Sequence, residues 1–275
     1  EYGKSLLAAG ITQVKGEFSS SDAVKLCNEE GEEVATVMSV PLMEEMPKGF
    51  MATRTGRRSM SWRDDMPHTI VYAEALDGGD PENEVDFRDQ VMQLDAPFDG
   101  EGELLLKTVD RFYDLSWGNE NFAIAYDYWW NTRNTKTYFF NPSQPGKKPT
   151  VVFDRNYQDV YSDPGEFITE EGDYPGSEVL AMNGSKVFLS GDGYTAEGQF
   201  PFVREMDIMT QKIKTLYQSE YTDKVESINE VYVKDKELLV RIESPSEYPN
   251  YYTRSLKNGK LNQMTFFKNP FEEIA

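Results

Sequence analysis

The sequence predicts an all-β fold. Aromatic residues make up 13% of the 275 residues, and short runs of alternating apolar and polar residues recur along the chain, as is typical of strands with one buried face. No long segment repeats apolar residues at the 3.6-residue spacing of an amphipathic helix. The runs are separated by residue pairs that readily adopt the positive φ of tight hairpins: Glu30-Gly31, Asp99-Gly100, Asn183-Gly184 and Asn258-Gly259.

The predicted strands fall into sets of four. The first complete set opens with a strand around Ser61-Trp62, and the second opens with one around Ser116-Trp117, 55 residues later. The remaining strands of these sets are predicted at 69–74, 90–94 and 103–108, then at 122–130, 135–140 and 150–153. The third set is predicted at 178–182, 186–189, 202–208 and 212–217, and the fourth at 228–233, 238–242, 251–256 and 261–267.

This period predicts a β-propeller. The repeats 110–154, 176–219 and 225–268 contain 45, 44 and 44 residues, and four strands every ~40–50 residues are typical of propeller blades. The repeat 57–109 fits the same pattern with a longer acidic loop inserted. Each blade is a small sheet that buries its faces only by packing on its neighbours.

The first 48 residues predict an incomplete blade. They contain only about three strand-like runs, at 5–11, 23–27 and 33–39. A propeller must close its ring to hide its edge strands. The sequence therefore predicts one propeller domain or segment over 1–275 with about five blades, the first incomplete, as part of a larger propeller.

Composition excludes several classes of function. Lys and Arg number 28 against 48 Asp and Glu, giving a formal net charge of −20, which disfavours nucleic acid and anionic membrane surfaces as partners. The single cysteine, Cys27, forms no internal disulfide, and the single histidine, His68, supplies no His-rich zinc site. The opening residues have too short an apolar run for a signal peptide, and the compartment is not predicted.

No catalytic residue, metal site or cofactor is predicted within the chain. The Gly-x-Ser-x-Gly elbow of α/β-hydrolases does not occur, and His68 falls at the start of a predicted strand, where a structural role is expected. The acidic loop 77–86 lacks the alternating ligands of a calcium loop, so we interpret it as a solvated connection, with a metal site as the alternative.

One basic cluster stands out in this acidic chain. Arg54, Arg58 and Arg63, with Arg57 among them, flank the opening strand of a blade, and inner strands line the channel of a propeller. The first three are candidate substrate-binding residues, because a guanidinium binds a carboxylate bidentately. The alternative is that they form structural salt bridges with Asp64, Asp65 and the acidic loop 77–86. The tryptophans are expected to pack between blades, with Trp130 the best candidate for exposure.

Several motifs resemble a known family. They include Gly56-Arg57-Arg58-Ser59-Met60-Ser61-Trp62-Arg63, Phe153-Asp154-Arg155, Asp159-Val160-Tyr161-Ser162-Asp163-Pro164-Gly165, and Glu197-Gly198 with Pro201-Phe202. In this order, over roughly 50–268, they resemble the propeller of the glutamyl endopeptidase branch of the prolyl oligopeptidase family. The resemblance implies peptide substrates, a covalently linked C-terminal α/β-hydrolase domain that holds Ser, Asp and His but is absent here, cleavage after glutamate, and an exported parent protein.

Three hypotheses for function follow. The first is the non-catalytic propeller portion of a serine endopeptidase, which gates and orients peptides for a hydrolase domain outside this chain. The second is a five-bladed propeller glycoside hydrolase with paired carboxylates about 5–10 Å apart. The third is a non-catalytic protein-binding propeller. Arginines at the channel favour the first, and clustered carboxylates on inner strands favour the second.

Overall fold

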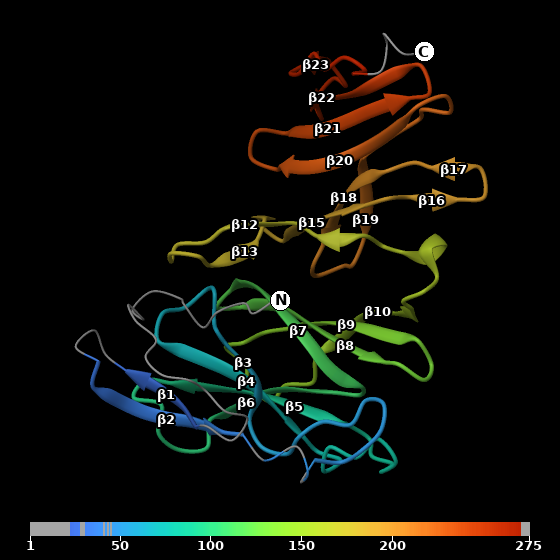
Figure 1. The fold of residues 1–275 in the computed structure, drawn as a ribbon. Helices are drawn as coiled ribbons and strands as arrows, with labels where there is room; N and C mark the ends of the chain where they lie inside the picture. Colours follow the sequence, from blue (N-terminus) through green and yellow to red (C-terminus); the bar gives the residue numbers. More distant parts are fainter. Residues whose placement is uncertain (1–22, 28–30, 41, 43, 45, 271–275) are drawn as a thin grey trace. The chain divides into compact units, whose positions relative to one another are not determined.

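The computed structural model describes residues 23–27, 31–40, 42, 44 and 46–270 (Figure 1). No α-helix occurs among these residues, so the all-β prediction is confirmed. The chain divides into two compact units, which we describe separately. Unit 1 comprises Glu1–Tyr157 and Glu170–Val179, and unit 2 comprises Gln158–Thr169 and Leu180–Ala275.

The first four-stranded sheet of unit 1 is an antiparallel meander. Its strands are β3 (Arg58–Trp62), β4 (Thr69–Ala75), β5 (Asp89–Asp95) and β6 (Glu103–Thr108), paired in chain order. The first five residues of β4 are all buried, as expected for a strand covered on both faces. All four strands lie where the sequence predicts them.

The second sheet of unit 1 has the same meander and two further strands. It contains β7 (Arg111–Asn119), β8 (Phe122–Trp129), β9 (Asn134–Phe140) and β10 (Thr150–Asn156). At its β7 edge come β13 (Glu178–Leu180) and then β12 (Thr169–Glu171). The prediction that 178–182 opens the third set is wrong in this detail, because β13 pairs in parallel with β7 of the preceding sheet.

Trp117 lies in the core of unit 1. Trp117 is buried against Phe140 with ring centroids 6.1 Å apart, and it lies in a cluster with Val71, Val91 and Leu106. Trp130 is 40% exposed, as its place in the sequence predicted.

Unit 2 contains two sheets and a hairpin. The first sheet has the order β11 (Glu166–Phe167), β15 (Lys186–Gly191), β18 (Phe202–Asp207) and β19 (Ile213–Gln218), and β14 (Met182–Asn183) also pairs with β15. The hairpin is β16 (Tyr194–Thr195) with β17 (Gly198–Gln199). The second sheet is the meander β20 (Val225–Tyr232), β21 (Glu237–Ser244), β22 (Glu247–Ser255) and β23 (Leu261–Gln263). Val203 from the first sheet packs in one cluster with Leu238, Val240 and Ile242 from the second.

Each of these successive sheets contains four antiparallel strands of the propeller-blade type, and the fold is a β-propeller fold. The number of blades stays a prediction. In the N-terminal segment the structure describes one antiparallel pair, β1 (Ala23–Cys27) and β2 (Glu33–Ser39). The strand predicted at 5–11 lies outside the described residues, so the incomplete first blade over 1–48 also stays a prediction.

Candidate functional site

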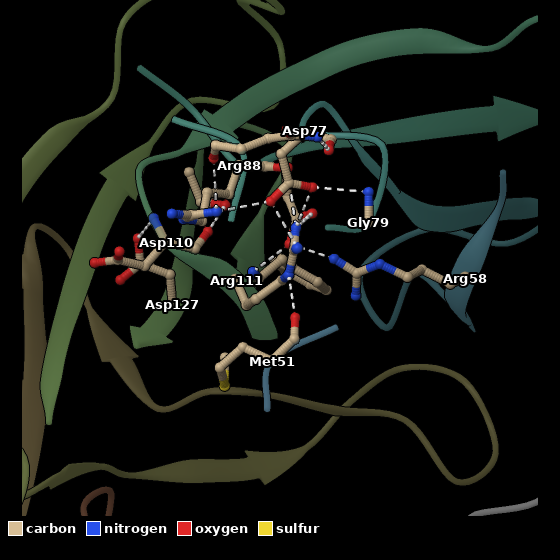
Figure 2. A network of polar contacts seen from close by, with 12 residues as sticks. Met51, Arg58, Asp77, Gly79, Arg88, Asp110, Arg111 and Asp127 are labelled. Atoms are coloured by element: carbon tan, nitrogen blue, oxygen red, sulfur yellow. Dashed lines mark hydrogen bonds and ion pairs between the residues drawn. The ribbon is translucent and has the colours of Figure 1, made fainter. Parts of the chain in front are cut away.

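Two buried aspartates of unit 1 bind one arginine between them (Figure 2). Arg111, at the start of β7, donates from Nη2 to Asp77 Oδ2 at 2.7 Å and from Nη1 to Asp89 Oδ1 at 3.1 Å. Its Nε donates to the carbonyl of Met51 at 3.0 Å. The side chains of both aspartates are fully buried. Such charges are tolerated in a protein interior only when they are paired and hydrogen-bonded.

Each carboxylate oxygen of this ionic cluster has a donor. Asp77 Oδ2 also accepts from Arg88 at 2.8 Å, and its Oδ1 accepts from the Gly79 amide at 2.9 Å. Burial alone would raise the pKa of Asp77, but the hydrogen bonds and charge of Arg111, together with Arg88, outweigh burial and lower it. The cluster fixes the start of the acidic loop 77–86 against the rest of unit 1.

The structure places two of the three predicted site residues in buried contacts. Arg58 is 8% exposed and pairs with Asp89 Oδ2, which also accepts from the Phe112 amide at 2.7 Å. Arg63 is 4% exposed and donates to both oxygens of Asp65, at 3.0 and 2.8 Å. These are the contacts that the salt-bridge alternative describes. A substrate-binding role for these two residues stays a prediction.

Arg63 makes two further contacts. Its Nη1 donates to Gln93 Oε1 at 2.6 Å, and its guanidinium lies 4.2 Å from the ring centroid of Trp117. Cation–π contacts of this kind stabilise a desolvated guanidinium. Arg63 is therefore fastened to the core.

Arg54 has a different environment. Its Nη2 donates to the sulfur of Met38 at 3.0 Å, a weak acceptor, and no described residue supplies it with a carboxylate partner. Burial, with the charge of Arg58 next, lowers its pKa. Neighbouring Arg57 instead donates to two carbonyls, of Val37 at 3.2 Å and Gly100 at 2.6 Å. Of the three candidates, Arg54 is the one without a described counterion.

A further buried acid, Asp127, lies near the ionic cluster (Figure 2). Asp127 is fully buried and accepts from the Tyr138 hydroxyl at 2.5 Å and from the amides of Asp110 and Lys136 at 2.9 and 3.0 Å. Burial raises its pKa to about 6. Burial and the neighbouring Asp127 charge also raise the pKa of Tyr138.

The acidic loop 77–86 is packed at its base. Gly79 has φ +77°, and a Cβ there would lie 2.0 Å from the carbonyl oxygen of Thr53. The Thr53 amide donates to the Gly79 carbonyl at 2.9 Å. Among the described residues no group of three His, Cys, Asp or Glu is arranged to hold a metal ion.

Unit 2 contains a pocket of about 520 Å³. It is formed by the segment around β11, the residues that join β15 to β16, and the middle of β20. Its acidic lining residues are Asp163, Glu166, Asp192 and Glu230. Sequence reasoning did not identify this pocket. The signal was available, because Val160, Asp163 and Gly165 belong to the motif at 159–165 that carries the family resemblance.

Two glycines determine the shape of this pocket. Gly193 has φ +64°, and a Cβ there would lie 1.9 Å from the Phe200 carbonyl oxygen. Gly165 has φ +92°, and a Cβ there would lie 2.6 Å from the Ser190 carbonyl oxygen. Any larger residue at either position would displace backbone.

Fold and contacts together define an all-β protein of the propeller type with a buried ionic cluster and an acidic pocket. Over 92% of its length the chain is 32% identical to two proteins named probable glutamyl endopeptidase, chloroplastic, from Oryza sativa subsp. japonica and Arabidopsis thaliana. It spans only 28% of the length of each. The chain is therefore related to proteins with this peptidase name.

The N-terminal segment has a second similarity. A family model described as the PUA domain matches residues 1–49. Glutamate 5-kinase from Microcystis aeruginosa is 70% identical to this chain over 33 residues. This stretch is 12% of this chain and 9% of the kinase. The peptidase similarity covers 92% of the chain, so it extends into the segment that the PUA model matches.

Solved structures are similar at a lower level. Prolyl oligopeptidase B from Galerina marginata aligns with a TM-score of 0.41 and 12% identity, over 78% of this chain and 29% of that one. An oligogalacturonate lyase in complex with manganese aligns with a TM-score of 0.48 and 9% identity, over 88% of this chain and 58% of that one. No helix among the described residues is long and apolar enough to cross a membrane.

Proposed function

We propose that this chain is the propeller portion of a serine peptidase of the prolyl oligopeptidase family, within its glutamyl endopeptidase branch. The observation that carries the proposal is the 32% identity over 92% of the chain to two proteins with that name. The blade-like sheets agree with it. In this proposal the chain contributes no nucleophile, and a linked hydrolase domain performs the hydrolysis.

The role we assign to the propeller is to admit and orient peptides. An enclosing domain with a narrow entrance excludes folded proteins by size, and holding a peptide in one orientation lowers the entropic part of the barrier. Arg54 is the candidate contact for a substrate carboxylate, because its guanidinium has no carboxylate partner among the described residues. Peptides are the proposed partners, and neither nucleic acid nor a membrane surface is among them.

The test begins with the coding sequence on both sides of residues 1–275 and expression of the longest open frame. We expect a downstream domain with Gly-x-Ser-x-Gly and later Asp and His. The longer protein is expected to cleave peptides after glutamate, with inactivation by a fluorophosphonate, and residues 1–275 alone are expected to cleave none. A stop codon directly after Ala275, or hydrolysis of aryl glycosides by the chain alone, would overturn the proposal.

A matched pair of variants tests Arg54. In the longer protein, Arg54→Gln is expected to raise KM for glutamyl peptides by about tenfold, the loss of one charge-assisted hydrogen bond. Lys148→Gln is the control, because Lys148 is exposed and belongs to the same unit. An equal KM for both variants would show that Arg54 does not bind the substrate carboxylate.

A further inference from the structure

The pocket of unit 2 has an unbalanced charge. The carboxylates of Glu166, Asp192 and Glu230 form no ion pair or hydrogen bond with any described residue, and Asp163 Oδ1 accepts from the Gly165 amide. The described lining contains no Lys, Arg or His. This contrasts with the buried ionic cluster of unit 1, in which every carboxylate oxygen faces a donor. Glu166, Asp192 and Glu230 therefore present negative charge to the pocket without an ion-pair partner among the described residues.

The walls of the same pocket are partly apolar. Val160, Phe167, Ile228 and Val231 line it, and Tyr194 adds an aromatic ring. Long basic side chains bury their methylene stems against apolar surface while the charged end meets polar groups, and aromatic faces attract cations. At about 520 Å³ the pocket lies within the roughly 300–1,000 Å³ typical of ligand sites. An apolar wall beside unpaired carboxylates suits a lysine or arginine side chain.

The strands around the pocket suit an extended peptide. β11 and β20 are each the terminal strand of their sheet, and both line the pocket. Terminal strands are where extended peptides add to a sheet through main-chain hydrogen bonds. In β20 the register shifts between Ile228 and Glu230, and bulges of this kind redirect side chains beside binding sites. Asn229 and Glu230 both lie in the lining.

We propose that this pocket binds a lysine or arginine side chain of an extended peptide that passes unit 2. The proposal rests on the proposed function, because it specifies which peptides the propeller would favour. It adds a preference for a basic residue at a position separate from the bond that is cleaved. The net charge of −20 reinforces it, because an acidic surface attracts basic peptides over a distance.

The first experiment measures binding to residues 1–275 by fluorescence anisotropy. The probe is a fluorescein-labelled seven-residue alanine/glycine peptide with one central lysine, compared with the same peptide carrying Nε-acetyllysine or glutamate. We expect the lysine peptide to bind at least ten times more tightly than either, with affinity falling as salt rises. Equal binding of the acetylated peptide would overturn the proposal, and so would free butylamine binding as tightly as the lysine peptide.

Isosteric variants test whether the lysine peptide binds in the pocket. Three substitutions remove charge at nearly constant size: Glu166→Gln, Asp192→Asn and Glu230→Gln. Combined, they are expected to weaken binding of the lysine peptide by more than tenfold. Glu220→Gln is the matched control, since Glu220 is an exposed acid of unit 2 outside the pocket. Thermal unfolding checks that each variant folds. If the triple variant folds and binds like the control, the proposal is wrong.

Cleavage by the longer protein separates this inference from the proposed function. If that protein cleaves peptides, and its kcat/KM shows neither a preference for a basic residue nor a response to the pocket variants, the inference fails while the proposed function stands. If it cleaves no peptide and the lysine peptide still binds residues 1–275 through these carboxylates, the proposed function fails while the pocket assignment stands.

Discussion

Removing the charge of Asp89 is expected to destabilise unit 1 more than any surface change. Oδ1 of Asp89 accepts from Arg111, and Oδ2 accepts from Arg58 and from the Phe112 amide. In Asp89→Asn the amide group would face one of these donors in either orientation. Breaking a buried pair by removing one partner costs about 3–5 kcal/mol, because the arginines stay buried.

Urea unfolding followed by tryptophan fluorescence measures this loss in unit 1. All four tryptophans of the chain lie in that unit, and Trp117 and Trp129 are buried. Asp99→Asn, at an exposed position of the same unit, is the control and is expected to change the free energy of unfolding by less than about 0.5 kcal/mol. A loss below about 1 kcal/mol for Asp89→Asn would refute the reasoning, because it would mean that water solvates these arginines.

Three further predictions concern Asp127, Gly193 and Glu226. Burial raises the pKa of Asp127 to about 6, so the native state holds the carboxyl proton of Asp127 more tightly than the unfolded chain does. The stability of the native state therefore falls as pH rises from about 4 to 6 and this carboxyl loses its proton. Acidification from pH 7 to 5 should therefore stabilise the wild type relative to Asp127→Asn by about 1 kcal/mol in urea unfolding, and parallel pH profiles would contradict this. Gly193→Ala should lower Tm well beyond Gly184→Ala, since both glycines have positive φ but only Gly193 has backbone within reach of a Cβ; equal shifts would argue against strain. Glu226→Gln should cost about 3 kcal/mol in thermal unfolding, because this 1% exposed carboxylate accepts from Arg254 and Tyr217, and a loss like that of Glu220→Gln would show that the pair is dispensable.

The strands could be predicted from the sequence because their signals are local. Apolar alternation and turn pairs lie within a few residues of each strand, and the meander order follows from short connections. β13 was assigned to the wrong sheet because its partner, β7, is about 60 residues away, and no local pattern records a parallel pairing at Trp117. Register between distant strands depends on packing.

The contacts of the basic cluster were only partly predictable. Asp65, two residues from Arg63, was among the expected partners. Asp89 is 31 residues from Arg58, and Gln93 is 30 from Arg63, so those pairs arise only when β5 joins the sheet that contains β3 and β4. The pocket was missed for the same reason, since three separate segments form it.

The ionic cluster of unit 1 and the pocket of unit 2 use their carboxylates in opposite ways, and this difference bears on function. In the ionic cluster of unit 1, Asp77 and Asp89 are neutralised by Arg58, Arg88 and Arg111, which act as structural cations. In unit 2 the pocket carboxylates retain their charge at low cost only while water or a ligand solvates them. A peptide that enters the pocket displaces that water. A neutral side chain there would leave the carboxylates desolvated without a compensating contact, whereas a basic side chain would form ion pairs with them. Selectivity for a basic side chain therefore follows from what unit 2 leaves unpaired.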